Sequence, residues 1–98
     1  LVEYCKFTPR FNPSECSMPL QDFLATRRYE DGLLQELLRK IPDLAVYDPI
    51  ASLCDARRCY LMRNGVLLYR DNHHLSVNGS KLVARDLKRW LAEKRLLD

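Results

Sequence analysis

The chain has 98 residues, of which 47% are hydrophobic and 30% are charged, and this is enough for one modest core but too little for two domains. Its net charge is only +3, and its basic residues alternate with acids along the expected helices, so no nucleic-acid partner is predicted. No apolar run approaches the ~18 residues that span a bilayer, and the polar N-terminus does not resemble a signal peptide. Because the chain begins with Leu1 rather than methionine, we expect it to be a piece of a longer protein.

The first half of the chain is expected to contain a short strand followed by a long helix. Residues 2–7 are predicted to form the strand, which Pro9 ends. Residues 20–41 are predicted to form a helix, which Gly32 can kink or split and which Pro42 ends. One face of this helix is apolar, because four residues recur at helical spacing: Leu34, Leu37, Leu38 and Ile41.

A second strand and the order of the elements indicate the fold class. Residues 44–47 are predicted to form a short buried strand before Asp48 and Pro49 turn the chain. Strand, helix, strand, helix is the pattern of an α/β layered fold with a parallel sheet. Because two strands are too few for a stable sheet, we expect the N-terminal part of the sheet to be missing from this chain.

The last forty residues predict a small hairpin and a second main helix. Asn64 and Gly65 lie between two apolar runs, and Asn-Gly in such a place is a strong hairpin signal. Ser76 is expected to cap a helix over residues 77–95. The buried side of this helix is predicted from apolar residues at helical spacing: Val83, Leu87, Trp90 and Leu91.

Four cysteines in so short a chain suggest disulfides, for which three pairings are formally possible. Cys54 and Cys59 enclose a loop short enough to close as a local disulfide, and Cys5 and Cys16 flank a proline-containing segment that a second one could close. The two local pairings are favoured, and they imply an oxidising compartment such as a periplasm or the cell exterior. Buried free thiols are the alternative, above all for Cys5 and Cys16.

Both histidines lie in one short segment beside a carboxylate. Asp71 precedes His74 by three residues, so the acid can orient the imidazole to take a proton from a hydroxyl nucleophile. Leu75 can anchor this loop in the core, and Gly79 allows the following helix to pack closely against the loop or a neighbouring strand. The alternative is that Asp71 and His74 form a plain surface hydrogen bond while His73 is solvated.

A zinc site is the metal-binding alternative for the same segment. The spacing of its two cysteines, Cys54 and Cys59, is not the C-x-x-C of common zinc sites, and two adjacent histidines would point in different directions. We therefore predict no metal and no other cofactor. The four ligands of such a site would be Cys54, Cys59, His73 and His74.

The residues around the histidines resemble a known family. Residues 67–79, Leu-Leu-Tyr-Arg-Asp-Asn-His-His-Leu-Ser-Val-Asn-Gly, resemble the last catalytic block of the SGNH hydrolase superfamily. They are most similar to SGNH domains fused to acyltransferase-3 membrane proteins, which O-acetylate cell-surface polysaccharides. The pair Leu53 and Cys54, the later Cys59 and the small hairpin also match the order of motifs in that family. The likeness covers most of the chain, although its specific motifs lie within residues 53–79.

The resemblance implies a three-layer, flavodoxin-like α/β fold with short parallel strands, two main helices and a small β-hairpin. Residues 1–98 would be the C-terminal portion of one such domain. Asp71 resembles the acid of a Ser-His-Asp triad and His74 the base, because His74 directly precedes Leu-Ser, while His73 would be an accessory residue or simply exposed. The implied reaction is acyl transfer, with acetyl as the expected group, to a cell-surface glycan or to water. The implied location is extracytoplasmic, on a parent anchored in the inner membrane.

The chain departs from the family where the nucleophile is expected. The family's serine lies in a Gly-Asp-Ser block, and its oxyanion hole uses a glycine and an asparagine from two further blocks. None of the three glycines, Gly32, Gly65 and Gly79, precedes an Asp-Ser pair. We therefore expect the chain to be inactive alone and to depend on a partner, either the missing N-terminal part of the domain or a second chain that completes the sheet.

A different class of function remains open, that of a small disulfide-stapled interaction domain outside the cytoplasm without catalysis. The enzyme hypothesis requires His74 to lie within hydrogen-bond reach of Asp71 and to face an open surface. A truncated sheet should also leave an unpaired strand edge or an exposed apolar patch, which invites association.

Overall fold

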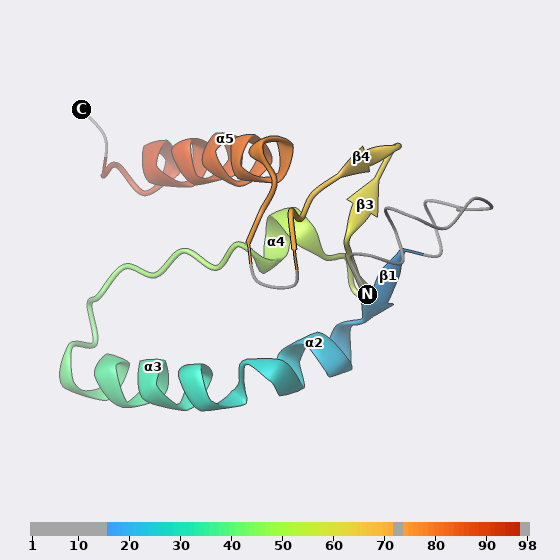
Figure 1. The fold of residues 1–98 in the computed structure, drawn as a ribbon. Helices are drawn as coiled ribbons and strands as arrows, with labels where there is room; N and C mark the ends of the chain where they lie inside the picture. The colour runs from blue at the N-terminus through green and yellow to red at the C-terminus, as the bar shows by residue number, and fades with distance from the viewer. Residues whose placement is uncertain (1–15, 72–73, 97–98) are drawn as a thin grey trace.

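The computed structural model describes residues 16–71 and 74–96 (Figure 1). The predicted strand over residues 2–7, Cys5 and His73 lie outside the described residues. The described elements mix helices with short strands. In chain order they are β1 (Ser17–Pro19), α2 (Leu20–Thr26), α3 (Arg28–Lys40), α4 (Ile50–Leu53), β2 (Arg58–Tyr60), β3 (Met62–Arg63), β4 (Val66–Leu67) and α5 (Val77–Glu93).

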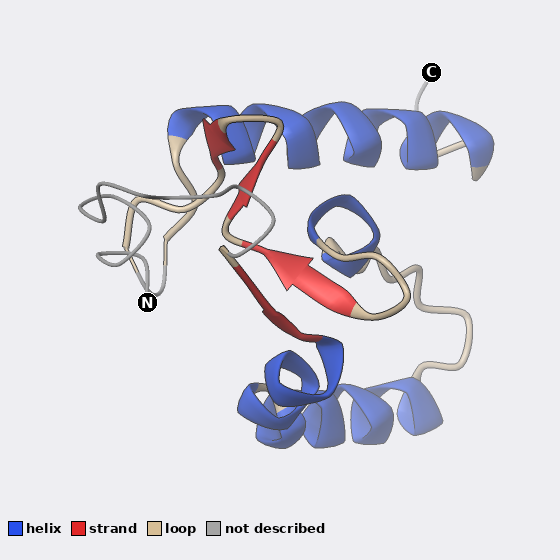
Figure 2. Cartoon of the chain, turned by 90° about the vertical axis from the view of Figure 1, so that its right-hand side faces the viewer, coloured by secondary structure: helices blue, strands red, loops and turns tan. Residues whose placement is uncertain are grey.

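The helices lie on two sides of the short strands. Helix α5 covers one side, α2 and α3 form the other, and α4 lies between them with the strands (Figures 1 and 2). The radius of gyration is 15.3 Å, whereas a compact domain of 100 residues has one of about 13 Å. The two outer helical layers are thus held apart rather than packed on each other.

Among the described helices, none combines the length and the apolar composition that a membrane span requires.

All described strand pairs are antiparallel, so the predicted parallel strands are not confirmed among the described residues. Strand β1 pairs with β2, with Ser17 opposite Tyr60, and β3 pairs with β4. The predicted strand over residues 44–47 is wrong, because this segment pairs with no described strand. Its backbone has no neighbouring described strand with which to form hydrogen bonds. Its apolar residues Leu44 and Val46 are exposed. What the described residues show is a mixed α/β chain.

The predicted hairpin and final helix are present. Asn64 and Gly65 both have positive φ angles, 54° and 76°, as a type I′ turn between two strands requires. Helix α5 begins at Val77 after Ser76, whose side chain accepts a hydrogen bond from the backbone of Gly79. The apolar side of α5 is only half-buried, because few elements cover it.

The long N-terminal helix breaks at Arg27 and not at Gly32, which lies inside α3. The Thr26 hydroxyl donates to the carbonyl of Phe23 at 2.6 Å, and such back-bonding bends helices. The backbone of Arg27 then bonds to Leu24, three residues back, and leaves the α-helical pattern. The chain therefore forms two shorter helices, α2 and α3.

The predicted apolar face of α3 is only partly covered. Neither α2 nor α3 contains a fully buried residue. Leu34 and Leu38 are half-buried, whereas three residues spaced by four positions remain exposed by 43% to 50%. We call these three residues the α3 apolar stripe: Leu33, Leu37 and Ile41.

The core is small and centres on a disulfide. Cys54 and Cys59 are bonded to each other, as predicted, and pack with the buried Leu53 and Leu68. Cys16 is also in a disulfide, whose partner lies outside the described residues. Elements from both ends of the chain complete this core with partly buried side chains: Met18, Leu20, Phe23, Ile50, Tyr60, Tyr69, Leu75, Leu82 and Val83.

An ion pair connects the helix break to the segment that follows α3. The Arg27 guanidinium donates two hydrogen bonds to Asp48, at 3.0 and 2.5 Å, and one to Asp31 at 3.1 Å. Asp48 also accepts a hydrogen bond from the backbone of Ile50 at the start of α4. The Arg27 guanidinium holds the pKa of the Asp48 carboxyl below its usual value.

This ion pair predicts a specific loss of stability in acid. Because the folded-state pKa of Asp48 is depressed, its contribution is present above about pH 4 and disappears as the pH falls through the folded-state value. Asp48→Asn should therefore cost less than about 1 kcal/mol at pH 7, since the pair is partly solvated, and less still at pH 3. Urea unfolding at both pH values measures this difference. Asp43→Asn is the control, and an equal pH dependence in both variants would contradict the assignment.

Candidate active site

The segment that carries the acid and the histidine is a closed loop between β4 and α5. The backbone N–H of Ser76 donates to the carbonyl of Leu68 at 2.9 Å, and Tyr69 forms an isolated bridge with Leu75. Inside this bridge the N–H of Arg70 donates to the carbonyl of His74 at 2.8 Å. Burial raises the pKa of the Tyr69 phenol. The lead-in to the loop is thus anchored in the core while the loop projects outward.

The start of α5 is locked against the end of β4. The Ser76 hydroxyl donates to the carbonyl of Leu67 at 2.6 Å and accepts from the N–H of Gly79 at 3.0 Å. A Cβ atom on Gly79 would lie 2.0 Å from the carbonyl oxygen of Leu68, far inside contact distance. The close packing predicted for Gly79 is therefore present. It sets the position of the loop relative to the helix.

Asp71 and His74 face each other across this loop. Both carboxylate oxygens of Asp71 lie 3.0 Å from Nδ1 of His74. The backbone N–H of His74 also donates to Asp71 Oδ1 at 2.8 Å, so the carboxylate holds both the main chain and the ring. Arg70 Nε lies 3.9 Å from the other oxygen of Asp71. The two side chains that the sequence singled out are thus brought together.

The pair is open to solvent. The side chain of His74 is 62% exposed and that of Asp71 is 41% exposed. When Nδ1–H donates to Asp71, the lone pair of the ring lies on Nε2. This arrangement can accept a proton from a hydroxyl group placed at Nε2, and Asp71 can stabilise the imidazolium that forms. His73, the predicted accessory residue, lies outside the described residues.

The hydroxyl groups of the described serines near the core are engaged in structural contacts. Ser17 accepts from Arg58 Nε, and Ser52 shares a hydrogen bond of 2.9 Å with the hydroxyl of Tyr47. Both serines are buried, and Ser76 is the helix cap described above. Ser80 is an exposed residue of α5. The hydroxyls of Ser17, Ser52 and Ser76 are thus held in structural hydrogen bonds.

The zinc alternative is wrong, because Cys54 and Cys59 form a disulfide and a zinc ligand must be a thiolate. Residues 16–71 and 74–96 contain no group of three metal-binding side chains.

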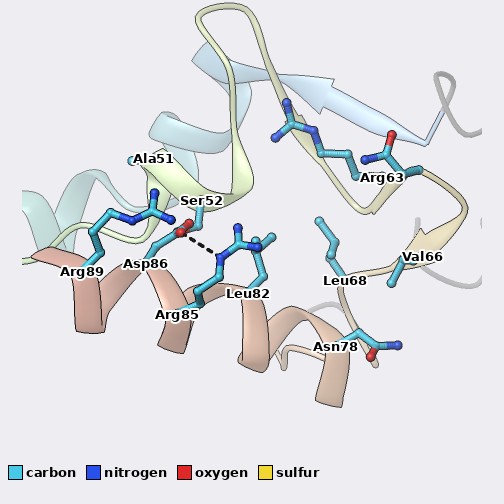
Figure 3. Close-up of a pocket in the computed structure, with 11 residues that line it drawn as sticks. Ala51, Ser52, Arg63, Val66, Leu68, Asn78, Leu82, Arg85, Asp86 and Arg89 are labelled. Atoms are coloured by element: carbon cyan, nitrogen blue, oxygen red, sulfur yellow. Dashed lines mark hydrogen bonds and ion pairs between the residues drawn. The ribbon is translucent and has the colours of Figure 1, made fainter.

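Two features of this region were not predicted from the sequence. One is the hydrogen bond from the backbone N–H of His74 to the Asp71 carboxylate. Aspartate side chains in loops often accept such bonds from backbone N–H groups a few residues later, so this bond could have been predicted. The other is a hollow of about 610 Å³ along α5, lined by Arg63, Arg85 and Arg89 (Figure 3). Arginines far apart in sequence give no local signal that they will converge.

Comparison with known proteins identifies the family. Residues 2–89 match the family model described as SGNH domain (fused to AT3 domains). No curated protein and no solved structure matches the chain at a significant level. The matched region includes the disulfide, the hairpin, the Asp71–His74 loop and most of α5. The chain therefore belongs to the family of SGNH domains that are fused to AT3 domains.

Proposed function

We propose that this chain supplies the acid and the base of a Ser-His-Asp triad for acyl transfer, with Asp71 as the acid and His74 as the base. Membership of the SGNH family relates the chain to acyltransferases and esterases. The observation that carries the proposal is the contact of His74 Nδ1 with both carboxylate oxygens of Asp71 at 3.0 Å, on a solvent-exposed loop. Such a pair is arranged to activate a hydroxyl nucleophile.

The proposed reaction has two half-reactions, and His74 takes and returns a proton in each. In the first, Nε2 takes the proton of a serine hydroxyl while the serine oxygen attacks the acyl carbonyl, and the imidazolium then protonates the leaving group of the donor. In the second, Nε2 takes a proton from a sugar hydroxyl or from water, whose oxygen attacks the acyl-enzyme, and the imidazolium returns the proton to the departing serine oxygen. Asp71 keeps the Nδ1–H tautomer and stabilises the imidazolium in both steps.

The nucleophile and the oxyanion donors are proposed to come from outside residues 1–98. The chain would be the C-terminal portion of one SGNH domain, completed by an N-terminal portion or by a second chain. This completion would also supply the parallel strands of the three-layer fold. The α3 apolar stripe supports the proposal, because Leu33, Leu37 and Ile41 form an uncovered surface suited to packing. Docking there would restore the core that α3 lacks.

The proposed setting is extracytoplasmic, with acetyl transferred to a cell-surface polysaccharide by a parent that is anchored in a membrane. The Cys54–Cys59 disulfide supports an oxidising compartment. The exposed Asp71–His74 pair favours catalysis over the alternative of a non-catalytic interaction domain, which has no need of an oriented and accessible imidazole.

The proposal is tested by hydrolysis of a simple acetyl ester. The 98-residue chain should give no rate above background, whereas the protein that also contains a Gly-Asp-Ser portion should be active. In that protein Asp71→Asn should lower kcat by on the order of 10³- to 10⁴-fold, because the tautomer of His74 is no longer held. Asp55→Asn, at an exposed aspartate of the disulfide loop, is the control. Hydrolysis by the 98-residue chain that is lost on His74→Ala would overturn the proposal.

A further inference from the structure

A second polar site lies along α5, apart from the acid and base. A cavity of about 610 Å³ opens between α4, the β3–β4 hairpin and α5. Arg85 and Arg89 reach into it from α5, and Arg63 extends over the same hollow from the hairpin (Figure 3). Three guanidinium groups from two elements therefore surround one space.

The positive charge of this cavity is only partly balanced by the protein, because three arginines and one aspartate line it. Asp86 is its one acidic lining residue, and it is already engaged by Arg85 Nε at 3.4 Å. In the described parts of the chain no carboxylate lies within ion-pair distance of Arg63 or Arg89, although Asp55 attracts Arg63 and Asp86 attracts Arg89 at longer range. Arg85 and Arg89 are four residues apart on one helix, a spacing at which like charges repel and destabilise the helix. A bound anion would relieve this repulsion.

The geometry of the cavity also provides directed hydrogen-bond donors. The Arg63 guanidinium lies 4.7 Å from the centroid of the Tyr60 ring, which holds it in place by a cation–π contact. The side-chain amides of Asn64 and Asn78 line the same cavity. Arginine forks recognise the oxygens of carboxylates and phosphates, and amide groups can bind sugar hydroxyls.

We propose that this cavity binds an anionic group, a carboxylate or a phosphate, carried by a glycan. Only the glycan carrier rests on the proposed function, whereas anion binding follows from the arginines themselves. Asn78 follows His74 by four positions, at the start of the helix that carries Arg85 and Arg89. The site would thus hold a charged substituent of the acceptor along α5 and favour acidic over neutral glycans.

The test is a titration of the 98-residue chain with inorganic phosphate and, separately, with glucuronate, at constant ionic strength set by chloride. Backbone amide shifts in the NMR spectrum should saturate at Asn78, Arg85 and Arg89. The double variant Arg85→Gln, Arg89→Gln should weaken the binding by about tenfold or more, because charge-assisted hydrogen bonds are lost. The control Arg28→Gln, Arg39→Gln removes the same charge from α3 and should change the binding by less than about twofold.

Some outcomes of this titration identify the anion, and others overturn the site. Tighter binding of glucuronate assigns a uronic acid, and tighter binding of phosphate assigns a phosphorylated glycan. Shifts that do not saturate with either probe, or an equal weakening in both double variants, overturn the site. If the α5 double variant does not fold, Arg63→Gln takes its place, and unchanged affinity there overturns the site as well. Because binding requires no nucleophile, this result is independent of the triad test.

Discussion

His74→Ala should abolish acyl transfer in the protein that contains both this chain and the nucleophile. Loss of the general base leaves the serine hydroxyl protonated, so kcat should fall by on the order of 10⁴-fold or more. The imidazole is 62% exposed and makes its side-chain contact with Asp71, so its removal should leave the fold intact. Initial rates on an acetyl ester, measured with the circular dichroism spectrum of each variant, give the result.

The neighbouring histidine provides a matched control for this substitution. His73→Ala removes the same ring one position away, and the family resemblance assigns the base to His74. Its rate should therefore stay within about tenfold of the unsubstituted protein, as expected for a residue outside the triad. Equal losses in the two variants would contradict the assignment of His74, and a larger loss in His73→Ala would reverse it.

Gly79→Ala should destabilise the chain strongly. The added Cβ would lie 2.0 Å from the carbonyl oxygen of Leu68 and 2.9 Å from its carbonyl carbon. Both are backbone atoms, so no rotamer change relieves the clash, and α5 must move away from β4. We expect the free energy of unfolding to fall by about 1–3 kcal/mol, the range for overpacked sites. The midpoint of urea unfolding measures this loss.

Gly32→Ala is the matched control, because it makes the same chemical change inside a helix. An added Cβ at Gly32 meets nothing within 4 Å. Alanine is the better helix former, so this variant should gain about 0.5–1 kcal/mol. The two substitutions should therefore have opposite signs. A loss of similar size in both would show that close packing at Gly79 is not the cause.

The parts of the fold that were predictable are those with local signals. Asn64 and Gly65 need only each other to form their turn, and Ser76 caps α5 through the nearby Gly79. The Cys54–Cys59 disulfide closes a short loop. Asp71 and His74 are three positions apart, so the spacing in the sequence already predicts a contact between the carboxylate and the imidazole.

The parts that were missed depend on distant partners. Strand β1 forms by pairing with β2, about forty positions later in the chain. No residue pattern within Ser17–Pro19 predicts that pairing. At the helix break, the Arg27 side chain bonds to Asp48 across the fold, a contact that no local pattern predicts. Residues 44–47 are apolar enough for a strand, but a strand forms only where a neighbour offers hydrogen bonds. The arginine-lined cavity likewise joins residues from separate elements.

The short loop that joins the acid to the base has a consequence for how such a domain assembles. The entropy lost in bringing two groups together grows with the length of chain between them, and here only two residues separate Asp71 from His74. The hydrogen bond from Ser76 to Leu68 closes the loop and offsets this small loss of entropy. The contact between Asp71 and His74 can therefore form without any distant segment. In the proposed function, the segment that carries the nucleophile would only have to align one hydroxyl with a ring that is already oriented.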